Sequence, residues 1–193
     1  MTIPIDVVFI WHMHQPFYKD PVKGEYALPW TYLHAIKDYY DMPAIVEDTP
    51  GARAVFNLVP SLVEQLLDYA AGTAVDPFLI KGQMNPADMS QEDRIFLLEN
   101  FFSANRQRMI EPHRRYLELL YMAGEGKPGA VRERERHFSH QDLQDLQVCF
   151  FLAWTGEAAR RRFPVFQELL AKGQGYTPED RALLFATQRK LLN

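Results

Sequence analysis

The stretch that decides the fold is Val7-Val8-Phe9-Ile10-Trp11-His12-Met13-His14-Gln15-Pro16. An apolar run that ends at a proline is typical of a buried strand, and Pro16 has no N–H to continue the pairing. Because side chains alternate along a strand, His12 and His14 share one face and Trp11 turns to the other, into the core. Parallel α/β sheets and barrels carry their sites at the carboxyl ends of strands, so we expect both histidines at a functional rim.

Three interpretations of the two histidines are open from their spacing. They can be hydrogen-bonded side chains of a core strand. They can be half of a zinc site, although Gln15 and Pro16 offer no third ligand. They can also form a polar floor for a sugar, because a neutral imidazole both donates and accepts hydrogen bonds.

Five segments of the chain resemble the amino-terminal part of glycoside hydrolase family 57, which holds enzymes of the α-amylase and 4-α-glucanotransferase type. The His-Gln-Pro tripeptide ends a first strand and Asn-Leu-Val-Pro-Ser follows a second one, at matching distances. The likeness spans nearly the whole chain, in the segments VVFIWHMHQPFY, LPWTYLHAIKDYYDMP, AVFNLVPSLVEQLLDYA, FFSANRQRMIEPHRRYLEL and QDLQDLQVCFFLAW.

The resemblance implies a seven-stranded (β/α) barrel that hydrolyses or transfers α-glucosidic bonds with retention, using a glutamate nucleophile and an aspartate acid/base. Both carboxylates lie on family motifs downstream of those matched here, so no residue of this chain receives a catalytic role. The resemblance also implies that His14 lines the glucosyl subsite where cleavage occurs. An α-glucan or a maltooligosaccharide is the expected substrate, and the chain alone is expected to be inactive.

The fold class is predicted as α/β, the beginning of a (β/α)7-type barrel with two parallel strands near the N-terminus, followed by a mainly α-helical segment. A complete barrel usually needs about 250 residues, more than the 193 of this chain. Residues 1–75 are expected to form the first strands and helices of the barrel. Residues 76–193 are expected to be a helical insertion packed on them in one structural unit.

Local signals place the elements. Residues 54–56 predict the second strand, and the helical spacing over 30–40 predicts a helix that breaks at Met42-Pro43. The loop 17–29 between them is a candidate lid over the substrate. Residues 124–136, rich in glycine, proline and charge, predict an exposed loop. The remaining helices are marked by capping and proline signals at Pro60, Gly72, Ser90, Asp93, Pro112, Ser139, Asp142, Pro164, Thr177 and Asp180.

Composition narrows the class of partner. A net charge of −4, from 21 basic and 25 acidic residues, gives no basic footprint for nucleic acid or for a membrane surface. No apolar stretch reaches about 18 residues and no signal peptide is evident. The single cysteine, Cys149, cannot form an internal disulfide and suits a reducing compartment. We expect a cytoplasmic protein.

The residues predicted to bind substrate are His12, His14, Gln15, Trp30 and Asn57. Trp30 can stack on a sugar ring or fill the core. Asn57 can donate to a sugar hydroxyl at the rim or cap the turn that follows it. No metal site and no cofactor are predicted, and His113, His137 and His140 lack metal-ligand spacing.

The carboxylates near the rim do not form a catalytic pair by position. A glycosidase needs two carboxylates that flank the scissile bond, whereas Asp20, Glu25, Asp38 and Asp41 all follow the first strand. Solvated or structural roles are therefore expected for them. His34 and Lys37 lie three apart on one helix face and are expected to be a surface pair.

Two other functions stay open. The chain can be a non-catalytic helical binding or scaffold protein. It can also be a zinc-dependent barrel enzyme of the α-mannosidase type, whose first strand also carries His-x-His but needs an aspartate where Pro16 stands. An unfinished barrel would expose strand edges and apolar helix faces, so self-association is predicted.

Overall fold

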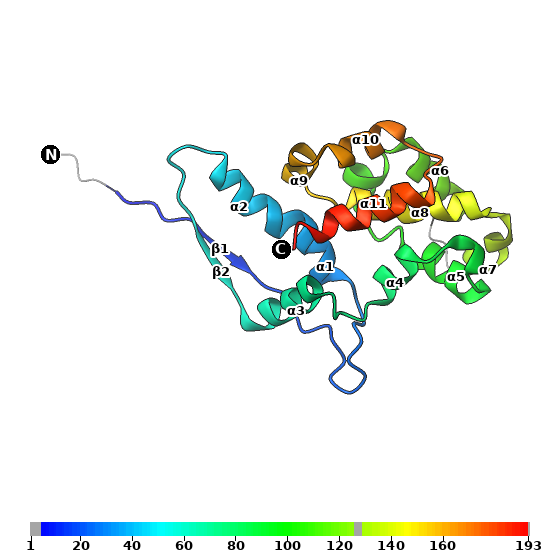
Figure 1. The fold of residues 1–193 in the computed structure, drawn as a ribbon, viewed down its shortest axis with the longest axis horizontal. Coiled ribbons are helices and arrows are strands. Elements are labelled where there is room, and N and C mark those ends of the chain that lie inside the picture. The colour runs from blue at the N-terminus through cyan, green and yellow to red at the C-terminus, as the bar shows by residue number, and fades with distance from the viewer. Residues whose placement is uncertain (1–4, 126–128, 193) are drawn as a thin grey trace.

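The structure, a computed structural model, describes residues 5–125 and 129–192 and is mostly helical (Figure 1). Two strands, β1 (Ile10–Met13) and β2 (Val55–Leu58), pair in parallel, with His12 opposite Asn57. The predicted start with two parallel strands, followed by a mainly helical segment, is confirmed. Over the described ranges these two strands make up the whole sheet.

The helices follow one another with short connections. None of those in the described part of the chain combines the length and apolar character needed to cross a membrane. The α-helices are α1 (Trp30–His34), α2 (Tyr40–Glu47), α3 (Pro60–Ala71), α4 (Pro77–Gln83), α5 (Gln91–Asn100), α6 (Arg114–Met122), α7 (Ala130–Arg134), α8 (His140–Ala153), α9 (Glu157–Arg162), α10 (Pro164–Lys172) and α11 (Pro178–Arg189). Short π-helical turns span Ala35–Tyr39 and Arg106–Ile110, and 3₁₀ turns span Pro86–Asp88 and Glu135–His137.

The first helix does not break at Met42-Pro43, so that prediction is wrong. α1, the π turn Ala35–Tyr39 and α2 follow one another directly, with Pro43 inside α2. Because the α-helical pattern restarts at Tyr40, Pro43 is the fourth residue of α2. The helix therefore continues through Pro43, with a local change of hydrogen-bond pattern at the π turn just before α2.

Capping predicted from the sequence is confirmed at three helix starts. Ser90, Ser139 and Thr177 each accept a hydrogen bond from the N–H of the aspartate three residues later, and that aspartate bonds back to the capping residue. α3 begins at Pro60 and is closed by Gly72, whose φ of 73° lies in the left-handed region that glycine tolerates. These signals act within a few residues, which is why the sequence alone reveals them.

The predicted exposed loop over 124–136 is wrong in its described part. It contains α7 and a 3₁₀ turn, and Val131 and Glu135 are buried. The Glu135 carboxylate pairs with Arg94 of α5, whose guanidinium also donates to the carbonyl of Phe138 over 2.7 Å. These contacts with a distant helix order a segment whose composition predicts a loop. Residues 126–128 of this prediction lie outside the described residues.

The core is built around α8. Every residue from Leu143 to Ala153 is buried, and α4, α5, α6 and α11 pack around this helix (Figure 1). Its apolar residues cover more than one face, as the sequence predicts for a helix enclosed on several sides. Aromatic rings fill the centre, with Phe101 stacked on Phe150 at 4.6 Å between ring centroids.

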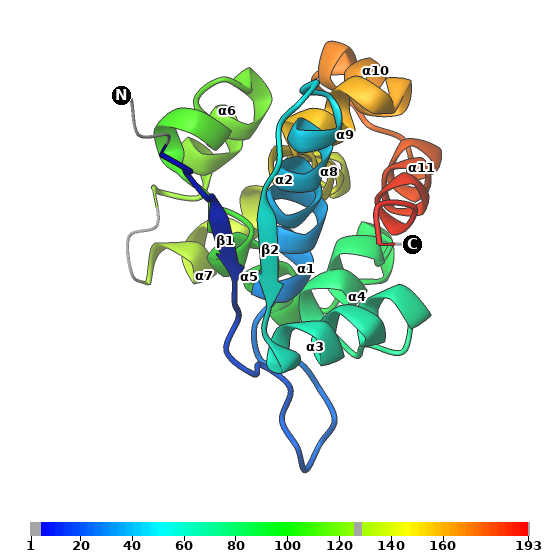
Figure 2. The same cartoon turned by 90° about the vertical axis from the view of Figure 1, so that its left-hand side faces the viewer.

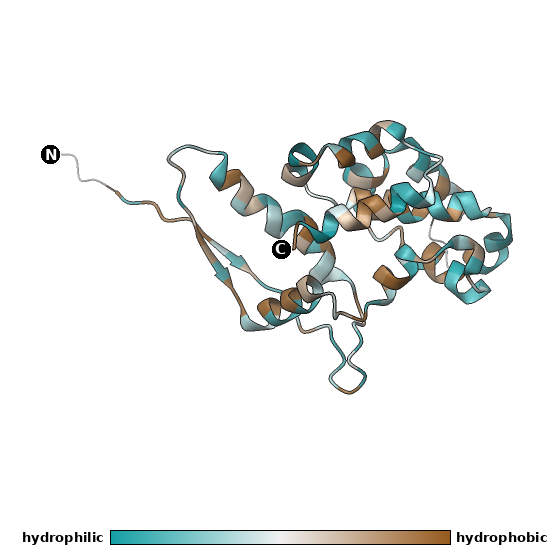
Figure 3. Cartoon of the chain, in the orientation of Figure 1, coloured by the Kyte–Doolittle hydropathy of each residue, from teal (hydrophilic) through white to brown (hydrophobic). Residues whose placement is uncertain are grey.

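The strands are covered by helices on one side only. Figure 2 shows β1 and β2 in front of the helices, and Figure 3 shows the apolar run that leads into β1 outside the helical mass. Val7, Val8, Phe9 and Ile10 are between 62% and 71% exposed, so the prediction of a buried apolar strand is wrong here. Trp11 turns to the helical side, as alternation predicts, and is half-buried with its ring 5.2 Å from Phe56.

Candidate functional site

Three polar side chains gather on the uncovered face of the two strands. His12, His14 and Asn57 are all exposed. The imidazole rings of His12 and His14 are nearly parallel, 5.9 Å between centroids and 11° apart. The parallel register sets Asn57 opposite His12, with its side-chain nitrogen 3.1 Å from His12 Nδ1. The two histidines and the asparagine, here named the rim group, are therefore brought together as the sequence predicts.

The rim group presents both donors and acceptors to a ligand. When the Asn57 amide donates to His12 Nδ1, the proton of that ring is carried by Nε2, which can donate outward. The Asn57 side-chain oxygen is then an acceptor beside it. A hydroxyl donates and accepts at the same oxygen, so an open group of this kind suits a ligand with several hydroxyls.

Asn57 does not cap the following helix. The N-cap position of α3 is Val59, which makes no side-chain capping bond. The capping alternative is wrong because the strand register turns the amide toward the imidazole of His12 instead.

Gln15 lies beneath the rim rather than on it. Its side chain is only 8% exposed and is held by two tyrosines. The Gln15 amide nitrogen donates to Tyr39 Oη, and the Gln15 amide oxygen accepts from Tyr18 Oη, each over 3.0 Å. The amide therefore stabilises the segment that carries His14.

The backbone after β1 is fixed by α3, through two residues that sequence reasoning missed. Ser61 Oγ donates to the carbonyl of Gln15 over 3.0 Å. Gln65 donates to the carbonyl of Pro16 and accepts from the N–H of Tyr18, both over 2.9 Å. Gln65 is fully buried, so a glutamine among the apolar positions of a helix was the signal that could have found it.

Trp30 begins α1 and is half-buried, with its ring centroid 5.8 Å from that of Trp154. The ring of His34 also lies against Trp154, at 5.4 Å, and 6.1 Å from the ring of Tyr39. Tyr39 in turn donates to the carbonyl of His14. Trp30 is thus linked to the rim group through a row of aromatic rings, and part of its surface packs on the helical layer.

Three of the four carboxylates near the rim, those of Asp20, Asp38 and Asp41, have structural partners. Asp20 accepts two backbone N–H groups of its own loop, which lower the pKa of its carboxyl group. Asp41 accepts the N–H groups of Glu157 and Ala158 at 2.7 and 2.9 Å and so caps α9. Glu25 is exposed in the loop. The contacts of Asp20 and Asp41 agree with the positional argument against a catalytic pair.

Asp38 joins the two residues predicted as a surface pair. Both His34 Nδ1 and Lys37 Nζ lie 2.5 Å from its carboxylate, and all three side chains are about one-third exposed. Burial raises the pKa of Asp38, but the hydrogen bonds from His34 and Lys37 outweigh it and hold the pKa below its ordinary value. The carboxylate is thus kept ionised by its two neighbours.

The loop after β1 is anchored at its base to α3. Lys19 Nζ and Tyr26 Oη both bond to the Asp68 carboxylate, at 2.7 and 2.9 Å, and Lys19 and Tyr26 face each other in an isolated bridge. Between these residues the loop projects away from the helices (Figure 1). Its proposed role as a lid stays a prediction.

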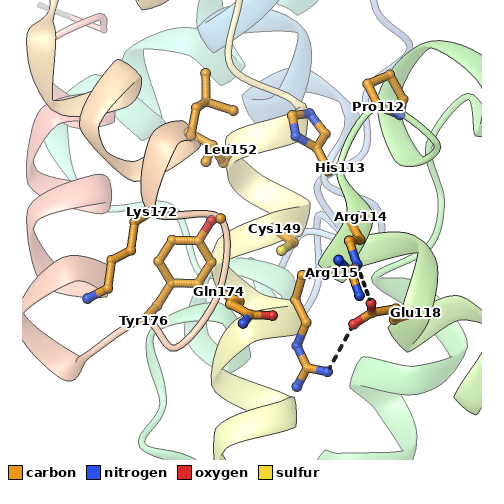
Figure 4. A pocket seen from close by; sticks show the side chains of 12 residues that line it. Pro112, His113, Arg114, Arg115, Glu118, Cys149, Leu152, Lys172, Gln174 and Tyr176 are labelled. Carbon is orange, nitrogen blue, oxygen red and sulfur yellow. Dashed lines mark hydrogen bonds and ion pairs between the residues drawn. The ribbon is translucent and has the colours of Figure 1, made fainter.

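A separate cavity of about 450 Å³ lies between α6, α8 and the segment before α11 (Figure 4). Its charged side chains pair with carboxylates: Arg114 with Glu118 at 2.9 Å, and Arg115 with Asp145 at 2.8 Å. Burial raises the pKa of the Cys149 thiol on its wall. The cavity shares no residue with the rim group.

Metal ligands do not converge in the described ranges. No three His, Cys, Asp or Glu side chains in residues 5–125 and 129–192 stand close enough to hold one ion. At the rim, the partner of His12 Nδ1 is the amide of Asn57. A zinc half-site at His12 and His14 therefore has no third ligand among these residues.

Comparison with known families settles the class of this protein. The sequence model of glycosyl hydrolase family 57 matches residues 8–178, a range that includes both strands, the rim group and the helices through α10. The chain belongs to glycosyl hydrolase family 57. The resemblance predicted from the His-Gln-Pro and Asn-Leu-Val-Pro-Ser segments is confirmed, and with it membership of a glycoside hydrolase family. Comparison with curated proteins and with solved structures gives no match.

Proposed function

We propose that the rim group binds an α-glucan or maltooligosaccharide within a family 57 enzyme that hydrolyses or transfers α-glucosidic bonds with retention. The observation that carries the proposal is the exposure of His12, His14 and Asn57 together at the carboxyl ends of two parallel strands. Family membership supports a carbohydrate substrate, and the mixture of donors and acceptors supports contact with sugar hydroxyls.

Each predicted binding residue has a distinct part in this proposal. His12 and His14 contact hydroxyls through their rings, and Asn57 orients the ring of His12 while its oxygen accepts from the sugar. Gln15 contributes by holding His14 in place through Tyr39. Trp30 offers the part of its ring that Trp154 leaves uncovered for stacking.

We further propose that no residue of this chain is the nucleophile or the acid/base. Retention requires two carboxyl groups about 5–5.5 Å apart. Near the rim, Asp38 is bonded to His34 and Lys37, and Asp41 caps α9. The catalytic glutamate and aspartate implied by the family resemblance would then lie on barrel strands outside these 193 residues.

Titration of the chain with maltohexaose, followed by NMR of the histidine rings, tests the binding proposal. We expect saturable shifts of the His12 and His14 signals, and none with the β-linked cellohexaose. His14→Ala should weaken binding about tenfold, equivalent to about 1.4 kcal/mol. His140→Ala, which removes an exposed histidine at the start of α8, is the matched control and should leave binding unchanged. Absence of binding at millimolar maltohexaose would favour a helical scaffold protein.

Product analysis tests the second proposal separately. The chain incubated with maltohexaose should release no shorter or longer oligosaccharides. Turnover that is lost in Asp38→Asn or Glu25→Gln would assign a catalytic carboxylate to this chain and overturn that part of the proposal alone.

A further inference from the structure

The π turn Ala35–Tyr39 determines where Tyr39 points. A π turn holds one residue more than an α-helical turn, so it rotates the side chains that follow it around the helix axis. Here the Tyr39 hydroxyl lies between two atoms of the segment after β1, one from His14 and one from Gln15. It donates to the carbonyl oxygen of His14 and accepts from the side-chain nitrogen of Gln15, each over 3.0 Å.

His14 needs such a contact because it lies beyond the strand ladder. The last paired residues of the two strands are Met13 and Leu58, so His14 has no partner residue on the other strand. Tyr39 donates a hydrogen bond to the His14 carbonyl and accepts one from the Gln15 amide. Tyr18 donates another to Gln15, so these groups form a chain of hydrogen bonds. Hydrogen bonds in such a chain polarise and strengthen one another.

The π turn is itself held by the connection between α8 and α9. The carbonyl oxygen of Ile36, inside the turn, accepts the N–H of Gly156 over 2.9 Å. Asp41, just after the turn, accepts the next two N–H groups, those of Glu157 and Ala158. The connection fits closely, because a Cβ on Gly156 would stand 2.4 Å from an Asp41 carboxylate oxygen. The helical segment thus fixes the turn that carries Tyr39.

We propose that Tyr39 is a positioning residue for sugar binding: its hydroxyl sets the backbone of His14 and the amide of Gln15, and thereby the direction of the His14 ring. The inference rests on the proposed function of the rim group. It adds that the helical segment, through Gly156 and the π turn, takes part in shaping a site built on the strands.

Tyr39→Phe tests the inference, because it keeps the ring and removes only the hydroxyl. We expect affinity for maltohexaose to fall about tenfold, as loss of one to two hydrogen bonds predicts. In the ligand-free chain, the His14 ring signals should shift and broaden, a change that a merely stabilising tyrosine would not cause. Tyr40→Phe is the matched control: Tyr40 is also half-buried, but its ring lies 5.9 Å from the Arg162 guanidinium. It should leave affinity and the His14 signals unchanged.

The outcomes separate the two proposals. Wild-type binding that persists unchanged in Tyr39→Phe, with unmoved His14 signals, overturns the inference and leaves the sugar-binding proposal intact. Failure of the wild-type chain to bind overturns the proposed function and the inference that rests on it. If Tyr39→Phe does not fold, Tyr18→Phe loosens Gln15 from its other side and should shift the same His14 signals. Unmoved signals in that folded variant would overturn the inference.

Discussion

Gln65→Met removes the side chain that ties the segment after β1 to α3. Gln65 is fully buried, accepts the N–H of Tyr18 and donates to the carbonyls of Pro16 and Ser61 at 2.9 and 2.7 Å. Methionine has a similar length and flexibility, so it fills nearly the same space without a polar end. The substitution therefore isolates the hydrogen bonds from the packing.

The expected loss of stability follows from the groups left behind. The N–H of Tyr18 and the carbonyl of Pro16 lose their partner, and an unsatisfied buried group costs about 1–3 kcal/mol. Tyr18 is half-buried and Pro16 exposed, so water replaces part of the loss. We therefore expect the free energy of unfolding to fall by about 2 kcal/mol, from the lower end of that range for each group.

Equilibrium denaturation in urea, followed by circular dichroism, measures this change. Gln83→Met is the control, since Gln83 is exposed and its single side-chain bond reaches Leu79 within the same helix. It should change the free energy of unfolding by less than about 0.5 kcal/mol. A Gln65→Met chain as stable as Gln83→Met would refute the reasoning that these bonds fix the rim segment.

Three further substitutions test other contacts. Gly156→Ala forces a Cβ against Asp41, and we expect about 1–3 kcal/mol of destabilisation in urea denaturation; a neutral result would show that the connection is not tightly packed. Asp38→Asn removes a carboxylate with a lowered pKa, whose stabilisation is present at neutral pH and lost as pH falls through the folded pKa. We expect about 0.5–1 kcal/mol at pH 7, decreasing as pH falls below the ordinary carboxyl pKa of 3.8; a pH-independent difference would contradict the ion-pair account. Phe101→Ala empties a fully buried ring site and should cost about 3–5 kcal/mol; a loss below about 1 kcal/mol would contradict the placement of the core.

Elements with local causes were predictable. The capping boxes at Ser90 and Ser139 use atoms three residues apart, and Gly72 ends α3 through its own backbone conformation. Two errors came from contacts over long distances in the chain. The contact of Glu135 with Arg94, 41 residues earlier, orders the segment that was predicted as a loop. The helix that contains Pro43 is continued by a π turn, which is held by a hydrogen bond from the N–H of Gly156.

By itself, the sequence determined that His12 and His14 share a face, because side chains alternate along a strand, and its motifs indicated the family. Only the tertiary structure decided that Asn57 pairs with His12, because this depends on the register between strands 45 residues apart. The role of Tyr39 was equally out of reach. A π turn rotates all later side chains of the helix, and it is held by a hydrogen bond to a residue more than a hundred positions away.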